Sequence, residues 1–279
     1  MPVAAIQEAF FLPRDAHGHS QRLAIHYRPA DGPIHGAVVY VHPFAEEMNK
    51  ARRMAALQSR ALARAGFAVL QVDLRGCGDS SGDHGDATWD AWIDDIVEAS
   101  HWLHKRHGAP LTLWGLRAGC LLAAEAAHRL DAPLDLLFWQ PATTGATVLH
   151  QFLRLELAAK MQATSGKGVL DALRAQFAAG NAVDVAGYRV AASMANAIER
   201  ATLEPTRHVG KLTWLEVSSR AATELLPASA KSVDRWRAAG HRVDTSVVQG
   251  SPFWHSVEIE EVPELIAATV AARATGLAA

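Results

Sequence analysis

The sequence has little cysteine, no long hydrophobic run and no export signal. Its 279 residues contain two cysteines, Cys77 and Cys120, which cannot build a disulfide framework and form no Cys-x-x-Cys metal motif. No apolar stretch reaches the length that crosses a bilayer, and the N-terminus lacks the basic and apolar parts of a signal peptide. We therefore expect a cytoplasmic protein without membrane insertion.

Long runs of one charge and metal-ligand spacings are also missing. The formal net charge is -2, so we expect no nucleic-acid partner. The fourteen histidines include no zinc-ligand spacing such as His-Glu-x-x-His, so no metal and no other cofactor is predicted. What the chain does have is 49% hydrophobic and 20% charged residues, the balance of a globular protein with a sizeable core.

Buried strands alternate with helices along most of the chain. Nearly continuous apolar runs predict buried strands at 36–41, 67–72, 111–114, 134–139, 212–217 and 243–248. Helical spacing predicts helices at 50–65, 88–104, 118–130, 229–239 and 263–274, with Thr88 as the N-cap of the second. Two more runs, 9–12 and 23–27, predict an antiparallel hairpin at the sheet edge. The pattern predicts an α/β fold with a mostly parallel, doubly wound sheet that binds ligands at the carboxyl ends of its strands.

The alternation stops between Pro141 and Pro205. Helical spacing there predicts helices at 148–161, 168–179 and 188–199, and the segment is too long for a simple connection. We interpret residues 142–205 as a helical cap inserted into an α/β core made of residues 1–141 and 206–279.

The strand that begins at Leu111 runs into Gly115-x-Arg117-x-Gly119 and then an alanine-rich helix. This is the frame of the G-x-S-x-G nucleophile elbow, a sharp turn between strand and helix that exposes one side chain. The exposed residue here is Arg117, whose guanidinium stays protonated and has no free lone pair for nucleophilic attack. The sequence therefore predicts a hydrolase scaffold without the usual nucleophile.

Three motifs follow predicted strands: His42-Pro43-Phe44, the glycine-rich loop Asp73-x-Arg75-Gly76-x-Gly78-x-Ser80, and His255. In this order they resemble the α/β-hydrolase superfamily over the whole chain. The segments 42–49, 115–117 and 250–255 are similar to the exosortase A system-associated hydrolase 2 family. This resemblance implies a capped hydrolase encoded near genes for exopolysaccharide biosynthesis and PEP-CTERM protein sorting.

The resemblance implies that His255 is the general base, since it lies in the loop where the superfamily places that residue. A neutral imidazole there can activate a hydroxyl, a thiol or a water, and the alternative is a surface loop histidine. Glu224 is the only carboxylate in residues 218–227, so it is the candidate that orients the imidazole. The alternative for Glu224 is a solvated loop glutamate.

Oxyanion and substrate contacts are expected around the elbow. Backbone N–H groups of Phe44 and Ala118 are the candidate oxyanion donors, and His42 and Glu47 are further candidates for substrate binding. Arg117 begins a helix, where a cation is disfavoured, so it needs an anion. Either Glu46 or Glu47 forms an ion pair with it, or it binds a carboxylate, a phosphate or a phosphopantetheine group of a ligand, and both can hold.

A displaced nucleophile is a further possibility. Cys120, one helical turn beyond Arg117, is expected to be a buried structural thiol. Cys77 and Ser80 lie in a loop near the same end of the sheet, and Ser218 or Ser219 could approach His255. None shares the exposed turn of an elbow residue, so we consider these residues only as alternative nucleophiles.

The leading interpretation is a hydrolase of an acyl ester or thioester in exopolysaccharide assembly. His255 would activate a water or a relocated nucleophile, and Arg117 would hold an anionic part of a small-molecule substrate or stabilise an oxyanion. Two alternatives remain. One is a noncatalytic binding or accessory protein that kept the pocket, and the other is an acyltransferase that works with an acyl carrier protein and excludes water.

Overall fold

An eight-stranded sheet forms the centre of the computed structural model, which describes residues 4–14, 20–160 and 166–274. The strand order is β1-β2-β4-β3-β5-β6-β9-β10. Their bounds are Ala5–Pro13, Gln21–Pro29, Phe67–Val72, Gly36–Val41, Leu111–Leu116, Leu134–Trp139, Val209–Ser218 and Arg242–Gln249. The β1–β2 and β2–β4 pairs are antiparallel, and every other pair is parallel. The predicted mostly parallel sheet with an edge hairpin is therefore confirmed.

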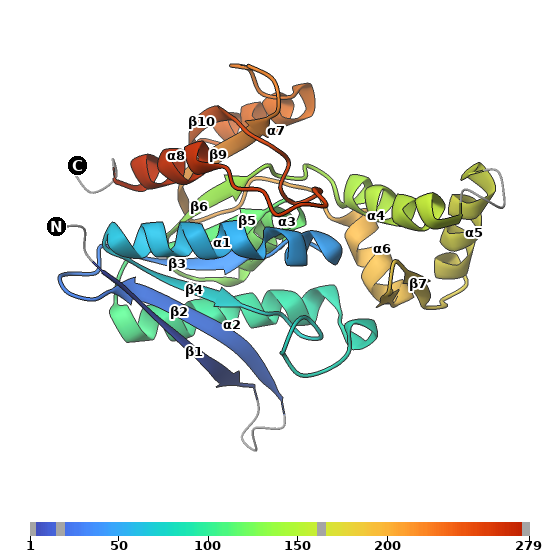
Figure 1. Ribbon diagram of the computed structural model, residues 1–279, viewed down its shortest axis with the longest axis horizontal. Helices are drawn as coiled ribbons and strands as arrows, with labels where there is room; N and C mark the ends of the chain where they lie inside the picture. Colours follow the sequence, from blue (N-terminus) through green and yellow to red (C-terminus); the bar gives the residue numbers. More distant parts are fainter. Residues whose placement is uncertain (1–3, 15–19, 161–165, 275–279) are drawn as a thin grey trace.

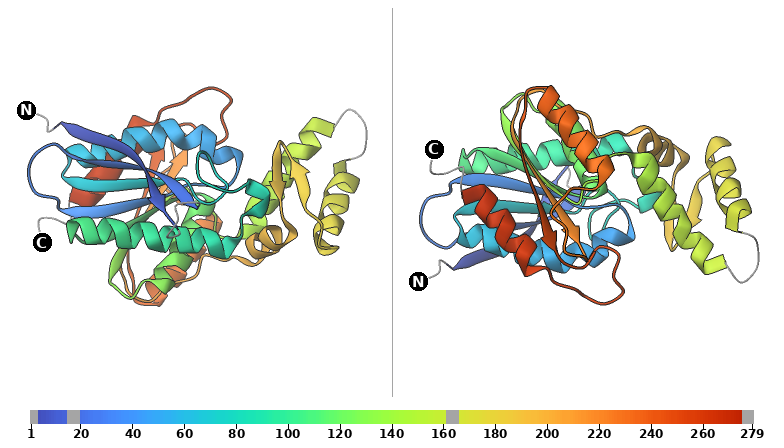
Figure 2. Two further views of the ribbon diagram at one scale, coloured as in Figure 1. Left: turned by 90° about the horizontal axis from the view of Figure 1, so that it is seen from below. Right: turned by 90° about the horizontal axis from the view of Figure 1, so that it is seen from above.

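Helices cover both faces of the sheet (Figures 1 and 2). Helices α1 (Glu46–Arg64) and α8 (Pro263–Ala274) lie on one face, and α2 (Trp89–His107), α3 (Ala118–Arg129) and α7 (Pro227–Ala238) lie on the other. Strand β3 shows why both faces are apolar. Its Val38 and Tyr40 side chains belong to the core under α1, while Val39 and Val41 belong to the core under α2 and α3.

Most predicted helices form, but α1 begins earlier than its spacing predicted. The prediction placed its start at residue 50, whereas Glu46 and Glu47 form its first turn. Two carboxylates there are favourable because a helix N-terminus carries a positive partial charge. The preceding residue, Ala45, has φ 51° and ψ -124° and offers no side-chain cap, so the usual N-cap signal is missing from the sequence at this start.

The predicted cap region contains α4 (Gly145–Lys160), α5 (Gly166–Ala178) and α6 (Ala192–Arg200), which lie beyond the carboxyl ends of the parallel strands (Figure 1). The predicted helix at 188–199 is wrong at its start. Residues Tyr188–Val190 form β8, which pairs with β7 (Val183–Val185) through a turn where Ala186 and Gly187 both have positive φ. Residue 161, the predicted end of the first cap helix, lies outside the described residues, and the cap boundaries at 142 and 205 stay a prediction.

Two short features complete the description. A 3-10 turn, η1 (His84–Asp86), follows the glycine-rich loop after β4 and contacts β8 of the cap region. No helix within the described residues is both long and apolar enough to span a bilayer.

We predict that Gly119→Ala destabilises the fold, because a Cβ at Gly119 would lie 2.2 Å from the Val41 carbonyl oxygen at the end of β3. The backbone contact cannot yield, so we expect a loss of about 2 kcal/mol or more in unfolding free energy. Urea unfolding followed by circular dichroism measures it. Gly168→Ala is the matched control, since nothing lies within 4 Å of its added Cβ. It should stabilise α5 by about 0.5–1 kcal/mol, and equal effects of the two variants would contradict the prediction.

Candidate functional site

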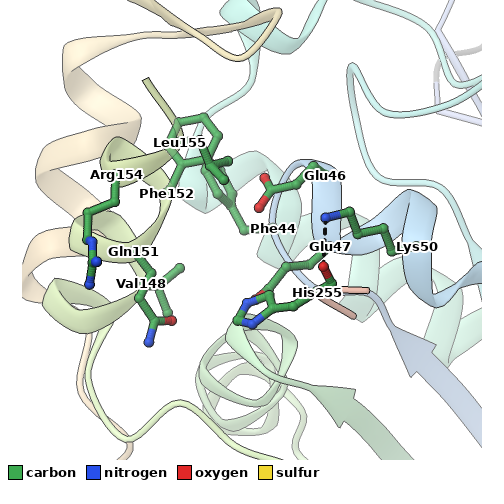
Figure 3. A pocket seen from close by; sticks show the side chains of 10 residues that line it. All are labelled: Phe44, Glu46, Glu47, Lys50, Val148, Gln151, Phe152, Arg154, Leu155 and His255. Atoms are coloured by element: carbon green, nitrogen blue, oxygen red, sulfur yellow. Dashed lines mark hydrogen bonds and ion pairs between the residues drawn. The ribbon is translucent and has the colours of Figure 1, made fainter. Parts of the chain in front are cut away.

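A cavity of about 320 Å³ lies at the carboxyl ends of the strands, between the first turns of α1 and helix α4 (Figure 3). One wall is apolar and consists of Phe44, Val148, Phe152 and Leu155. The polar lining consists of Glu46, Glu47, Lys50, Gln151, Arg154 and His255. A concave site with an apolar wall and a few convergent polar groups is the usual form of a small-molecule site.

Arg117 occupies the turn between β5 and α3 in a strained backbone conformation. Its φ is 55° and its ψ is -117°, a region that a residue with a side chain rarely adopts. Gly115 is required beside it, because a Cβ there would lie 2.7 Å from the backbone of Cys120. The predicted elbow turn therefore exists, with an arginine at its apex.

The Arg117 side chain is held by three neighbours and is only 11% exposed. Its Nε donates to Glu47 Oε1 at 3.2 Å, and a terminal nitrogen donates to Gln151 Oε1 of α4 at 2.6 Å. The guanidinium carbon lies 5.7 Å from the ring centre of Trp254, a cation–π contact. The predicted ion pair with a glutamate of this loop is thus confirmed for Glu47. Arg117 does not line the cavity itself, so it acts on the cavity through Glu47 and Gln151.

His255 meets the same carboxylate. Its Nε2 lies 2.6 Å from Glu47 Oε1, so one oxygen serves both Arg117 and His255. The loop after β10 is fixed further by Lys50, whose Nζ donates to the His255 backbone oxygen at 3.1 Å. The imidazole remains 46% exposed, while the Glu47 side chain is 9% exposed. Nε2 is the nitrogen that would face a serine at the elbow in a Ser-His pair, and Glu47 occupies that direction here.

Glu224 is not brought to His255. It is exposed in the segment between β9 and α7, and no hydrogen bond joins it to His255 within the described residues. Glu216, inside β9, is the buried carboxylate of this region: it accepts from Leu226 N at 2.9 Å and from Trp214 Nε1 at 3.3 Å. Glu216 therefore holds the segment after β9, and a role for Glu224 stays a prediction.

The candidate oxyanion donors lie at the ends of β3 and β5. Phe44 is buried and its ring lines the cavity, and Ala118 is the first residue of α3. Within the described residues, neither backbone N–H is recorded as donating to another protein group. Both remain candidates for binding an anionic oxygen.

His42 has a structural position instead. Its Nδ1 donates to Pro43 O at 2.8 Å, and its Nε2 accepts from Leu74 N at 3.3 Å. Burial lowers the pKa of His42, in keeping with a neutral ring that joins the ends of β3 and β4. With both nitrogens engaged and the ring buried, the structure argues against the expected contact with substrate.

The alternative nucleophiles are occupied elsewhere. Cys120 is fully buried, its Sγ donates to Trp139 O, and burial raises its thiol pKa well above the ordinary value. Ser80 Oγ donates to Asp73 O at 2.5 Å and accepts from Leu23 N at 2.9 Å. Burial also raises the pKa of Cys77, to about 12. These environments oppose nucleophilic roles for all three. The described residues also include no group of three or more His, Cys, Asp or Glu side chains placed to hold a metal ion.

Comparison with known sequences gives a family and a distant relative. The sequence profile of the family described as serine aminopeptidase, S33, matches residues 32–205, more than half of the chain. Protein ABHD12B from Homo sapiens is 32% identical over 115 residues, which cover 40% of this chain and 30% of that protein. The match therefore spans less than a third of the human protein's length.

Solved structures share the architecture. Est1E from Butyrivibrio proteoclasticus, solved with ferulic acid, gives a TM-score of 0.65 at 16% identity, covering 96% of this chain and 99% of that one. A thermostable carboxyl esterase from Bacillus coagulans, solved with glycerol, gives 0.60 at 16% identity, covering 98% and 99%. At these identities the likeness shows the fold alone. It confirms the α/β-hydrolase fold, as predicted.

We predict that Glu47→Ala lowers the unfolding free energy by about 3 kcal/mol, because it leaves the largely buried Arg117 guanidinium without its anion. Adding Arg117→Leu should restore much of the loss, since it removes the unpaired cation. A double-mutant cycle in urea measures the coupling. The matched control is the exposed pair of Glu204 and Arg235, where Glu204→Ala should cost about 1 kcal/mol or less. Additive losses for Glu47 and Arg117 would contradict the prediction.

Proposed function

Because the chain belongs to the serine aminopeptidase S33 family, we propose that it is a hydrolase of an acyl ester or thioester that uses an activated water in place of an elbow serine. The observation that carries this proposal is the 2.6 Å contact between His255 Nε2 and Glu47 Oε1 on the wall of the cavity. A histidine held by a carboxylate is the arrangement that makes an imidazole an effective base.

In this proposal Glu47, rather than Glu224, orients His255. Glu47 accepts a hydrogen bond from the Nε2–H group of His255. In the neutral ring the free lone pair is then on Nδ1. Nδ1 takes a proton from water, the water oxygen bonds to the acyl carbon, and Phe44 and Ala118 N–H groups stabilise the oxyanion. The carbon–oxygen or carbon–sulfur bond then breaks, and His255 returns the proton to the leaving group.

Arg117 serves two purposes in the same proposal. In the observed state it fixes the Glu47 oxygen that receives His255. A substrate carboxylate or phosphate could displace Gln151 and accept hydrogen bonds from the Arg117 guanidinium, whose N–H groups suit a two-oxygen acceptor. The resemblance to the exosortase A system-associated hydrolase 2 family suggests a substrate from exopolysaccharide assembly. An acyl carrier protein is a candidate donor of such a thioester.

A second function, noncatalytic binding, is favoured by one observation. Arg117 and Glu47 together fill the direction from the elbow to His255 Nε2, where a nucleophile would stand. A protein that uses the cavity only for binding would lose no function when Arg117 and Glu47 occupy the position of a nucleophile. The variant Arg117→Ser/Glu47→Ala separates the two functions, because it frees Nε2 and supplies a hydroxyl at the elbow.

We predict that wild type hydrolyses at least one member of a panel of acetyl, butyryl and octanoyl p-nitrophenyl esters and coenzyme A thioesters. His255→Ala should lower kcat/KM about a hundredfold or more, because the base is lost. Glu47→Gln should also lower it, because the anion that orients the ring is lost. His128→Ala, an exposed histidine at the far end of α3, is the control and should keep wild-type activity.

Mass spectrometry of the intact protein during turnover tests the water route. No acyl adduct should accumulate, whereas a trapped acyl-protein would contradict direct attack by water. If wild type is silent towards the panel and Arg117→Ser/Glu47→Ala acquires esterase activity, the binding function is supported instead.

A further inference from the structure

Glu46 is a carboxylate in the cavity whose Oε2 has no hydrogen-bond partner within the described residues. It belongs to the first turn of α1 and lines the cavity beside Glu47 and Lys50. In Figure 3 its carboxylate points from α1 toward the α4 side of the cavity. Neither the ion pair nor the hydrolytic proposal uses this residue.

The partners that could satisfy Glu46 are engaged or distant. Lys50 donates to the His255 backbone oxygen, and the Arg154 side chain points away from Glu46 in Figure 3. Within the described residues, no ion pair and no hydrogen bond to another residue is recorded for the Glu46 carboxylate. Its Oε2 is buried and unpartnered. Burial raises the pKa of Glu46, while its own backbone N–H acts in the opposite direction.

An unsatisfied carboxylate on the wall of a ligand cavity calls for a donor from the ligand, because a buried acceptor without a partner is costly. The surroundings specify the donor. Glu46 and Glu47 carry two negative charges, whereas Lys50 and Arg154 of the lining and the neighbouring Arg117 carry three positive ones, so the site does not favour a cationic donor such as an ammonium group. Phe44 and Phe152, with ring centres 5.0 Å apart, supply an apolar surface beside the carboxylate.

We propose that Glu46 is a specificity-determining residue that accepts a hydrogen bond from a hydroxyl group of the ligand. The ligand is then a small hydroxylated acyl compound, with its carbon skeleton against Phe44 and Phe152 and its hydroxyl on Glu46. The volume of about 320 Å³ lies at the small end of ligand pockets, roughly 300–1,000 Å³, and so suits a short compound. That the ligand has an acyl group rests on the proposed function. That it has a hydroxyl group rests on the Glu46 carboxylate alone.

Amides that cannot turn over test the proposal by binding. One pair, 3-hydroxybutyramide and butyramide, places the hydroxyl on the acyl side. The other, N-(2-hydroxyethyl)acetamide and N-ethylacetamide, places it on the side of the leaving group. NMR titration of wild type should show at least one hydroxylated amide binding about tenfold more tightly than its parent. Glu46→Ala should abolish that preference, and Glu46→Gln, which keeps an acceptor oxygen, should retain part of it.

Glu264→Gln is the matched control, an exposed glutamate in the first turn of α8, and should keep the full preference. Equal binding within both pairs, or a preference that survives Glu46→Ala, would overturn the proposal. Tighter binding of N-(2-aminoethyl)acetamide than of its hydroxyl analogue would overturn the assignment to a hydroxyl. The amides need no turnover: a silent protein that prefers the hydroxyl refutes only the hydrolytic function, and an active one without the preference refutes only this inference.

Discussion

A single carboxylate oxygen, Glu47 Oε1, joins the parts of the site. Arg117 reaches it from the turn after β5, and His255 reaches it from the loop after β10, while Glu47 itself stands in the first turn after β3. Gln151 then ties Arg117 to α4. Because these elements come from four distant parts of the chain, the geometry of the cavity depends on keeping one buried anion and one buried cation together. Neither is tolerated alone at such low exposure.

The two turns that hold this pair have nearly the same backbone shape. Ala45 has φ 51° and ψ -124°, and Arg117 has φ 55° and ψ -117°, and a helix begins directly after each. Such conformations cost about 1–3 kcal/mol each for residues with a side chain and persist where surrounding structure fixes them. The close contact of Gly119 with the end of β3 fixes the Arg117 turn against β3, the strand that leads into the Ala45 turn. The strain and the ion pair are therefore features of one junction.

The sequence predicted the sheet well because buried parallel strands and amphipathic helices leave strong periodic patterns. Helix α2 was predicted with its N-cap, and Thr88 Oγ1 does accept from Ala91 N. Helix α1 was predicted too short, because Ala45 caps it through backbone conformation alone. The site was predicted in part: the ion pair of Arg117 follows from charge at a helix N-terminus. The sequence did not predict that His255 contacts Glu47 rather than Glu224. Both contacts depend on the conformations of long loops, which the spacing of residues along the chain does not encode.

In the proposed function, an arginine at the elbow turn is consequently more than the absence of one hydroxyl. In a Ser-His pair the imidazole Nε2 faces the elbow, and here Nε2 faces a carboxylate that the elbow residue itself holds in place. A serine at residue 117 alone would leave Glu47 bound to His255 and would remove the cation that balances it. The elbow residue, Glu47 and the cap contact at Gln151 thus form one unit. We therefore expect serine chemistry at this turn to require changes at two of these residues together, because Glu47 occupies His255 Nε2 for as long as it remains in place.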